Sequence, residues 1–395
     1  MLITGGRVLV DSGTYVEDGA VLIEGESIAA VGPRKEIEER AGADVPLFEF
    51  GGTVLPGLID AHVHLVFDGG PDPVSTLQGS TDDVLFEDMQ RRGEQLLKSG
   101  VTTVRDLGDR GGLALRLAAE INDRRTPGPR IVSAGTPATT VGGHCHFLGG
   151  EVSGKTEIRE LVRRNLAAGA GVIKAMVTGG GLTKDGPKSH QSQFSVEELA
   201  ALVEEAHQAG VPVAAHAHGA DGIAAAVEAG VDTIEHCTWM SSDGLDFRPD
   251  VVQQIITKGI TVCPAVSPHW QMLPKFFGEE RANAMFDLVR QMADAGVRLI
   301  AGTDAGVQRT GFDGLVPALG FYSHLGLPNS AIIDMATSQA AAALGLGEIT
   351  GKVAPGYRAD LLLVDGDPLA DLSALSGVRA VFSSGQLYEP NSTDQ

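Results

Sequence analysis

Side chains that bind metal ions or transfer protons recur at the ends of short apolar runs in this sequence. His62 and His64 stand two residues apart in "IDAHVH". Alternate residues of a strand share a face, so the two imidazoles can bind one ion, although two unrelated surface histidines give the same spacing. Further apolar runs end at or contain Lys174, His216, His236 and Asp304. Because these side chains all belong to predicted strands or their ends, we predict that they form one functional site.

Lys174 has an unexpected position in "AGVIKAMVTGGG" (170–181), an apolar run that leads into a glycine turn. A strand buried on both faces should not hold an ammonium group, because desolvating a lone charge is costly. Three explanations are open at this point. The lysine points to solvent, it is a deprotonated nucleophile of the Schiff-base type, or it is chemically modified.

The composition describes a globular chain with an acidic surface. Of 395 residues, 43% are hydrophobic, and the net charge is −21 with a pI near 4.8. This charge argues against nucleic acid and anionic membranes as partners. We find no signal peptide and no apolar run of about 18 residues, and the three cysteines imply no disulfide framework. We therefore predict a cytoplasmic protein with a small-molecule substrate, and a homo-oligomer is compatible with the sequence.

A helix–glycine–strand unit recurs along the chain. Glycine ends a helix readily, and the Val, Ile and Thr residues that follow favour a strand. One of the preceding helices, "FSVEELAALVEEAHQAG", opens with a capping box of Ser195 and Glu198. The unit stands at "KSGVTTV" (98–104), "QAGVPVA" (208–214), "EAGVDTI" (228–234), "TKGITVC" (257–263) and "DAGVRLI" (294–300), with "GAGVIKA" (169–175) as a close variant.

This alternation predicts an α/β fold with parallel strands, and eight strands fit a (β/α)8 TIM barrel. A doubly wound open sheet is the alternative, which the lack of GxGxxG after the first strand weakens. In such barrels the functional residues gather at the carboxyl ends of the strands. The predicted strands are 53–60, 101–106, 130–134, 171–177, 211–216, 231–236, 259–263 and 297–303.

The two ends of the chain alternate apolar and polar residues, as antiparallel strands do. The segments are 6–32, 359–369 and 378–388. We predict that both termini form one small β-sandwich domain, residues 1–54 and 352–395, beside a barrel of residues 55–351. Residues 389–395 are predicted to be a frayed tail.

The chemistry-bearing segments together resemble the amidohydrolase superfamily. The branch they resemble contains dinuclear prolidases, Xaa-Pro carboxypeptidases and imidazolonepropionase-like hydrolases. The resemblance covers essentially the whole chain. It rests on "PGLIDAHVH" (56–64), "TTVGGHCHFLGGEVSG" (139–154), "KAMVTGG" (174–180), "VAAHAHG" (213–219), "TIEHC" (233–237), "GTDAG" (302–306) and "GYRADLLLVDGDPL" (356–369).

The resemblance implies a dinuclear metal centre. His62, His64 and Asp304 would hold the first ion, and His216 and His236 the second. CO2 would carbamylate Lys174, and the anionic carbamate would bridge the two ions together with a hydroxide. Imidazole and carboxylate ligands suit Zn²⁺, and Mn²⁺, Fe²⁺ or Co²⁺ could also bind. A Schiff-base lysine would need no such cluster of imidazoles.

The resemblance also implies catalytic roles. Asp304 would be the general acid and base, and His144 or His218 would stabilise the oxyanion. His218 stands where prolidase-like relatives often have a tyrosine, which leaves proline specificity open. Predicted pocket residues are Phe67, Lys188, His190, Trp270 and Arg309, of which Lys188, His190 and Arg309 could bind a substrate carboxylate. Arg105 is predicted to form an ion pair with Asp106 or a neighbour, and His146, His190, His207, His269 and His324 to be surface, loop or structural residues.

The predicted reaction is hydrolysis of a C–N bond in an amide or a dipeptide-like compound. A lactonase or ester hydrolase would use the same site. A catalytically inert scaffold derived from a hydrolase is the alternative from another class, but all six ligand positions keep competent side chains. A mononuclear deaminase would leave Lys174 without a clear task.

Overall fold

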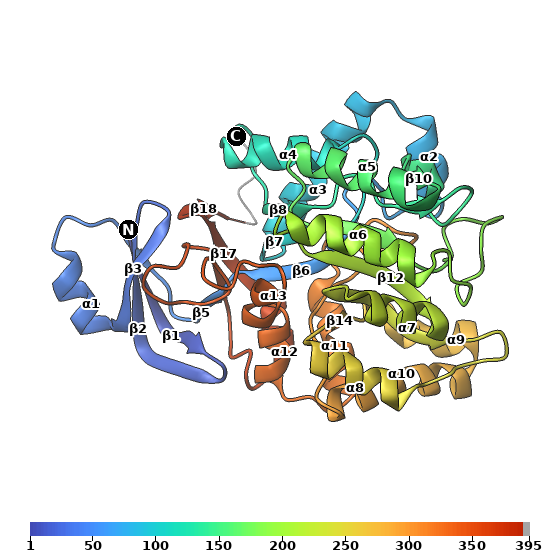
Figure 1. Ribbon diagram of the computed structural model, residues 1–395. Coiled ribbons are helices and arrows are strands. Elements are labelled where there is room, and N and C mark those ends of the chain that lie inside the picture. Colours follow the sequence, from blue (N-terminus) through green and yellow to red (C-terminus); the bar gives the residue numbers. More distant parts are fainter. Residues whose placement is uncertain (390–395) are drawn as a thin grey trace.

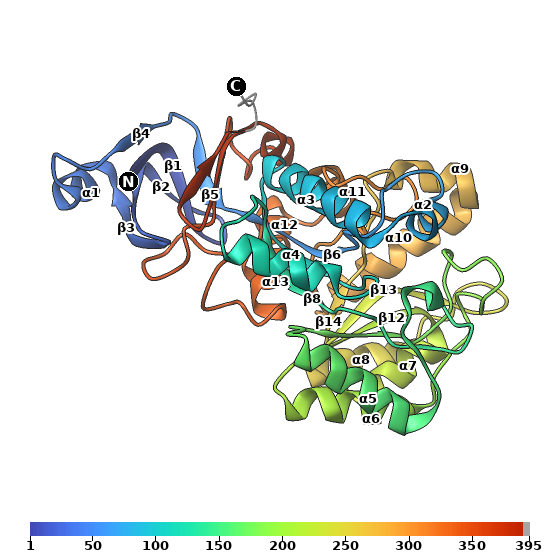
Figure 2. The same cartoon turned by 90° about the horizontal axis from the view of Figure 1, so that it is seen from above.

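The computed structural model describes residues 1–389 and has two parts (Figures 1 and 2). A mixed β-sheet built from both ends of the chain lies beside a larger region in which parallel strands alternate with helices. Residues 390–395 of the predicted tail lie outside the described residues. Within the described chain, every helix is too short or too polar to cross a membrane.

One eight-stranded sheet unites the two ends of the chain. β5 joins them, because it pairs in parallel with β1 and antiparallel with β16. The sheet is therefore mixed, whereas the sequence predicted antiparallel strands only; the chain crosses over through helix α1 (Arg34–Ala41) before it returns alongside β1. Ile3, Val54 and Leu363 lie fully buried in its core. The strands are β1 (Leu2–Asp11), β2 (Thr14–Glu24), β3 (Ser27–Pro33), β4 (Leu47–Glu49), β5 (Thr53–Pro56), β16 (Leu361–Val364), β17 (Val378–Ser383) and β18 (Gln386–Tyr388).

The parallel strands form two sheets, in the orders β6-β7-β8 and β11-β12-β13-β14-β15. Parallel bridges link the two sheets along both edges, between Val63 and Ala305 and between Ala138 and Ala175. All eight strands therefore direct their carboxyl ends to the same side. Their bounds are β6 (Leu58–Val63), β7 (Val101–Asp106), β8 (Arg130–Ser133), β11 (Ile173–Met176), β12 (Val213–Gly219), β13 (Thr233–Met240), β14 (Thr261–Cys263) and β15 (Arg298–Leu299), with a small pair β9 (Thr139–Thr140) and β10 (Glu151–Val152).

Helices cover the outside of these strands (Figures 1 and 2). They are α2 (Pro73–Gly79), α3 (Asp82–Lys98), α4 (Leu113–Asn122), α5 (Gly154–Ala167), α6 (Val196–Gln208), α7 (Ala220–Ala229), α8 (Pro249–Lys258), α9 (Leu273–Phe277), α10 (Glu279–Asp294), α11 (Leu315–His324), α12 (Asn329–Met335) and α13 (Ser338–Ala343), with 3-10 turns at η1 (His146–Leu148), η2 (Trp270–Met272) and η3 (Leu372–Ser376).

The predicted helix–glycine–strand junctions are confirmed. The five junction glycines have φ between +69° and +95°, the conformation that glycine adopts without strain; they are Gly100, Gly210, Gly230, Gly259 and Gly296. In the variant unit, Gly169 rather than Gly171 takes this conformation. The capping box of Ser195 and Glu198 at the start of α6 is also confirmed.

The predicted strand 53–60 is in fact two strands, because the chain passes from the mixed sheet into the parallel region at Gly57. The Gly57 N–H donates to the Asp360 carbonyl at 2.9 Å, outside the parallel region. A Cβ at residue 57 would lie 2.2 Å from Thr102 Oγ1 on the neighbouring strand. Glycine thus permits the close approach that aligns β6, and with it His62, beside β7.

We expect Gly57→Ala to lower the free energy of unfolding by about 1–3 kcal/mol, because the added methyl group overpacks a buried contact. Urea unfolding of both proteins would measure this difference. Gly79→Ala is the control, because a Cβ at this helical glycine would meet nothing within 4 Å. Equal losses in the two variants would contradict the steric explanation.

Candidate metal centre

The structure brings all six predicted ligands into the wall of one cavity of about 290 Å³, at the carboxyl ends of the parallel strands. His62 lies in β6, and His64 follows that strand directly. Lys174, His216 and His236 belong to β11, β12 and β13, and Asp304 lies beyond β15. The same wall contains His144 and His218.

Hydrogen bonds fix which ring nitrogen of three histidines is free. His62 Nδ1 lies 3.0 Å from Glu235 Oε2, His64 Nδ1 lies 3.1 Å from the Gly108 carbonyl, and His216 Nε2 lies 3.1 Å from the Gly179 carbonyl. These oxygens accept, so the named nitrogens must carry the protons. The other nitrogen of each ring, Nε2 of His62 and His64 and Nδ1 of His216, therefore keeps its lone pair for a metal ion.

Two of these free ring nitrogens, on His62 and His64, converge on the carboxylate of Asp304. Asp304 Oδ1 lies 3.3 Å from His62 Nε2 and 3.4 Å from His64 Nε2, and it is buried without a hydrogen-bond partner among the described residues. Burial would raise the pKa of Asp304, but His62 and His64 hold it well below its ordinary value, so the carboxylate is anionic. Burial would lower the pKa of His64, yet Asp304 raises it, which again favours positive charge at this point. The atoms present fit a cation between them.

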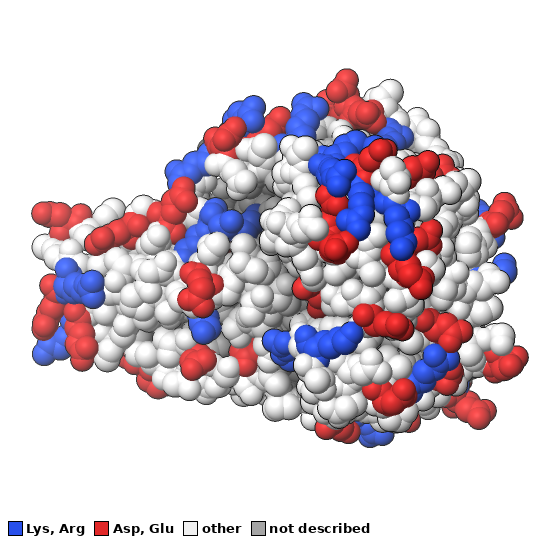
Figure 3. All heavy atoms as spheres, in the orientation of Figure 1, with Lys and Arg blue, Asp and Glu red and all other residues white. Residues whose placement is uncertain are grey.

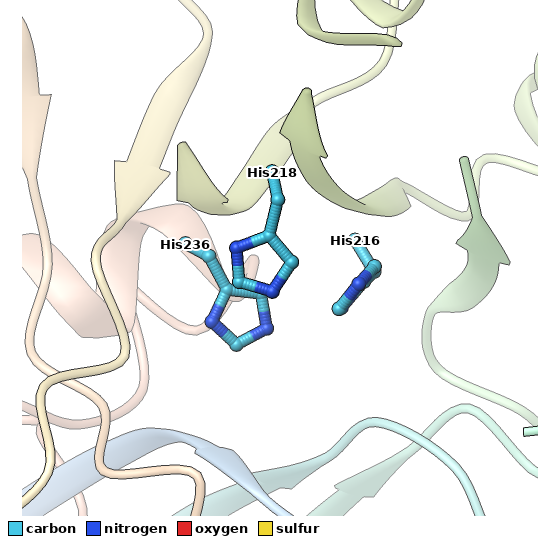
Figure 4. A group of neighbouring side chains, drawn as sticks. All are labelled: His216, His218 and His236. Atoms are coloured by element: carbon cyan, nitrogen blue, oxygen red, sulfur yellow. The ribbon is translucent and has the colours of Figure 1, made fainter. Parts of the chain in front are cut away.

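A second group lies beside the first. His216, His218 and His236 place ring nitrogens within 4.8 Å of one another, and His236 reaches the same distance from His62 and Asp304. The rings of His218 and His236 stack with centroids 4.5 Å apart, with His216 beside them (Figure 4). Burial lowers the pKa of His218 to about 4 and those of His216 and His236 well below the ordinary value. Neutral imidazole is the form that binds metal.

The backbone is irregular where His236 enters the site. His236 has φ +69° and Cys237 φ +51°, both in the left-handed region that non-glycine residues rarely adopt, and the pairing with β12 shifts register nearby. Asp304 has φ +60°. Such conformations cost free energy and cluster at functional sites, where they direct a side chain.

Lys174 does not face solvent, so that explanation is wrong. The residue is 1% exposed, and within residues 1–389 its Nζ has no hydrogen-bond partner. Burial, reinforced by Arg105, lowers its pKa to about 8 against the opposing charges of Glu235 and Asp304. An amine held this way is partly neutral near physiological pH, which both remaining explanations, nucleophile and modified lysine, require.

Glu235 is a functional residue that the sequence reasoning missed. Its fully buried carboxylate accepts hydrogen bonds from His62 Nδ1 at 3.0 Å and from Arg105 Nη2 at 2.8 Å. Arg105 therefore pairs with Glu235 rather than with Asp106, whose carboxylate accepts from two backbone N–H groups instead. Burial would raise the pKa of Glu235, but Arg105 and His62 lower it below its ordinary value. The signal that singled out Lys174, a charged residue inside a buried strand, would also have found Glu235.

The two predicted oxyanion donors differ in their hydrogen bonds. Thr238 Oγ1 donates to the His218 carbonyl and lies 3.0 Å from His218 Nδ1, so this nitrogen carries the proton and Nε2 is an acceptor. At His144, Thr183 Oγ1 accepts from the Cys145 N–H and lies 3.4 Å from His144 Nδ1. Because a hydroxyl oxygen can accept two hydrogen bonds and donate one, this contact is compatible with either tautomer of His144. Burial lowers the pKa of His144 to about 3. Neutral His218 therefore has no Nε2 proton to donate to an oxyanion, whereas His144 can donate in the tautomer that carries its proton on Nε2.

The cavity wall differs from the predicted substrate pocket. Among the described residues it includes Leu182, Val307 and Gln308 but no arginine and no lysine other than Lys174. A second cavity of about 510 Å³ shares Leu182 and Gln308 with it and adds Phe147 and Lys184. The residues predicted to contact substrate line neither cavity; they are Phe67, Lys188, His190, Trp270 and Arg309.

The remaining histidines fall mostly outside this centre. His207 pairs with Asp232 at 2.8 Å on the surface, and the His324 ring packs against Trp270. His269 is exposed. His146 lines the outer cavity.

The convergent imidazole and carboxylate groups could hold a metal ion, and comparison with known proteins identifies the family of this chain. The family model for the amidohydrolase family matches residues 53–388. The chain therefore belongs to the amidohydrolase family and is a hydrolase, which confirms the resemblance found in the sequence.

Individual relatives agree with this assignment. The crystal structure of an Xaa-Pro dipeptidase with bound methionine in the active site has a TM-score of 0.85 and 30% sequence identity, covering 98% of this chain and 99% of that one. Ochratoxinase from Aspergillus niger is 26% identical, covering 98% of this chain and 86% of that protein. Imidazolonepropionase from Geobacillus kaustophilus is 27% identical, with 88% and 84% covered.

We expect Glu235→Gln to lower the free energy of unfolding by about 3 kcal/mol, because it leaves the Arg105 charge buried without its partner. Urea unfolding would measure the loss. Glu38→Gln is the control, since Glu38 pairs with the half-exposed Arg34 and its removal should cost less than about 1 kcal/mol. A loss at residue 235 no larger than the control would show that the buried pair does not stabilise the fold.

Proposed function

We propose that this protein is a dinuclear metal-dependent hydrolase that cleaves the C–N bond of an amide or a dipeptide-like compound. The observation that carries the proposal is the buried Lys174 Nζ, which has no hydrogen-bond partner among residues 1–389 and lies beside converging imidazole and carboxylate acceptors. The relatives named as ochratoxinase, imidazolonepropionase and Xaa-Pro dipeptidase support this reaction class.

We also propose that the eight parallel strands form a (β/α)8 barrel over residues 55–351, and that the mixed β-sheet forms a small second domain from residues 1–54 and from the described residues after 351. Support for a closed barrel comes from the links at both edges of the parallel sheets, including the Asp304 N–H to His62 carbonyl bond of 2.8 Å and the Gly171 N–H to Ser133 carbonyl bond of 3.0 Å. A closed barrel would hold the ligands at a single mouth.

The donor set fits two divalent ions. His62, His64 and Asp304 would hold one, and His216 and His236 the other, with the free Nε2 of His218 close by. Addition of the neutral Lys174 amine to CO2, with loss of one proton, would give an anionic carbamate that both ions can share. Nitrogen and oxygen donors suit Zn²⁺, and Mn²⁺, Fe²⁺ and Co²⁺ accept the same set.

The ions would supply a water of lowered pKa and polarise the substrate carbonyl. Asp304 would take a proton from the attacking water and deliver it to the departing amine nitrogen. His144 Nε2–H would donate to the oxyanion that develops on the former carbonyl. Glu235 accepts from His62 Nδ1–H, which leaves His62 Nε2 free to bind an ion and would orient the ring for it.

The cavity supports a substrate that is uncharged next to the scissile bond. Among the described residues, Lys174 is the only lysine in the cavity wall, and the wall contains no arginine. As a carbamate, Lys174 would lose its positive charge. The adjoining cavity offers Phe147 and Leu182 to a bulky apolar group, and Lys184 to an acidic group farther away. An amide that extends across both cavities fits this arrangement.

Metal uptake should depend on bicarbonate. We expect chelator-treated enzyme to regain metal and activity faster with bicarbonate than without it. At constant dissolved CO2 the rate should rise as pH increases through about 8, because the neutral fraction of the Lys174 amine increases. Metal analysis during reconstitution at pH 7 and pH 9 would measure this. Equal reconstitution in CO2-free buffer would contradict a carbamate.

Turnover should be confined to amide substrates and should depend on Lys174. We would assay the metal-loaded enzyme with N-acyl amino acids, Xaa-Pro and other dipeptides, and lactones. We expect hydrolysis of amides with apolar groups beside the scissile bond. Lys174→Met should lower kcat/KM more than about 100-fold, since loss of a mere supporting partner costs 10–100-fold.

Lys35→Met is the matched control, because it makes the same substitution on helix α1, beside the mixed sheet. This variant should keep full activity. Preferential turnover of lactones would instead favour an ester hydrolase. Protein that purifies without stoichiometric metal and turns over no substrate would favour an inert scaffold.

A further inference from the structure

A separate cavity of about 350 Å³ lies where the mixed sheet meets the α4–β8 connection, and none of its lining residues belongs to the metal centre. Its walls come from Arg124 and Arg125 after α4, Arg130 at the start of β8, Arg358 before β16 and Ser384 after β17. Figure 3 shows a hollow at this seam with basic side chains along its edge. The volume lies within the range of small-molecule sites.

The cavity is basic in a strongly acidic protein. Four arginines and one glutamate, Glu26, are the charged residues that line it, while the whole chain carries a net charge of −21. No lysine contributes among the described residues. The arginine guanidinium group has five N–H donors in a rigid fork that matches phosphate and carboxylate oxygens.

Three of the four arginines have acidic partners. Arg124 pairs with Glu26, and Arg125 pairs with Asp123 at 2.9 Å. Arg358 Nε lies 3.4 Å from Asp360 Oδ1, and its Nη2 donates to Ser384 Oγ. Because Ser384 Oγ accepts this bond, its own proton is available to another acceptor.

Arg130 has no such partner. It forms no ion pair within the described chain, and its Nε is buried without a hydrogen-bond acceptor. Burial lowers the pKa of Arg130, and the nearby positive charge of Arg358 lowers it further. The positive charge of Arg130 therefore has no paired anion among the described residues. A buried N–H donor without an acceptor destabilises the fold.

We propose that this cavity binds an oxyanion of the phosphate class, either free or as a phosphomonoester. The anion would accept hydrogen bonds from Arg130 on the parallel-strand side, and from Arg358 and Ser384 on the mixed-sheet side. It would thereby separate the two like charges and join the two parts of the molecule.

Titration calorimetry on the full-length, metal-loaded enzyme tests the site with inorganic phosphate and with glycerol phosphate, against chloride at matched ionic strength. We expect one phosphate to bind per chain at this cavity. Arg130→Gln and Arg358→Gln should each weaken binding about tenfold or more, because each removes a charged donor. Arg290→Gln, an exposed arginine on α10 that pairs with Asp287, is the control and should leave the affinity unchanged.

The metal ions could bind phosphate as well, so inhibition of turnover is measured in parallel. Arg130→Gln should weaken the binding of phosphate that calorimetry measures. It should not change the constant with which phosphate inhibits turnover, because that inhibition would arise at the metal ions. Tighter binding of glycerol phosphate would indicate a phosphorylated metabolite as the ligand, and equal binding would indicate free phosphate; both support the site. Unchanged affinity in Arg130→Gln and Arg358→Gln, or an adventitious ion only at the metal centre, would overturn it. If Arg130→Gln does not fold, Arg358→Gln and the conservative Arg130→Lys decide the result.

Discussion

The buried ion pair of Arg105 and Glu235 is the interaction on which the rest of the site depends. It joins β7 to β13 beneath the cavity, while Arg105 Nε also donates to the Ala61 carbonyl of β6 at 2.8 Å. Taking two charges out of water is costly unless both are fully hydrogen-bonded, and here Thr233 completes the set by donating to Glu235 at 2.7 Å. The same Glu235 carboxylate also orients the His62 ring. One side chain therefore helps to hold three strands together and sets the direction of a candidate ligand nitrogen.

Much of the fold and site could be predicted because their signals are local. Glycine at a helix end and a capping serine each act within a few residues of sequence, and the structure has Gly230 and Ser195 in the expected places. His216 lines the cavity as predicted, although β12 continues past it to Gly219. Lys174 was recognisable because charge conflicts with an apolar strand. Glu235 carries the same conflict, but its importance depends on Arg105, which is distant in the sequence and adjacent only after folding.

What the sequence could not provide depends on contacts between distant segments. The close approach at Gly57 is set by Thr102 on a neighbouring strand. Within residues 53–60 the Pro56–Gly57 pair was a local signal of a break, but it does not show that the chain passes from one sheet to another. The expected carboxylate-binding residues, Lys188 and Arg309, lie on loops after strands as predicted. They do not line the cavity, and Leu182 and Gln308 from the same loops do. Loop paths are decided by packing rather than by residue type, so side chains on loops are the least predictable part of a site.

The pairing of β5 with both β1 and β16 has a consequence for synthesis. Val54 lies beside Val8 and also opposite Leu363, near the far end of the chain. A nascent polypeptide leaving the ribosome can form the β1–β5 pair early, but the other edge of β5 remains unpaired until β16 has been translated. Open strand edges recruit other chains, and late long-range pairing is slow. The late strand β16 thus completes the sheet that the early strands begin, and termination of synthesis before β16 would release a molecule with an unpaired, aggregation-prone strand edge.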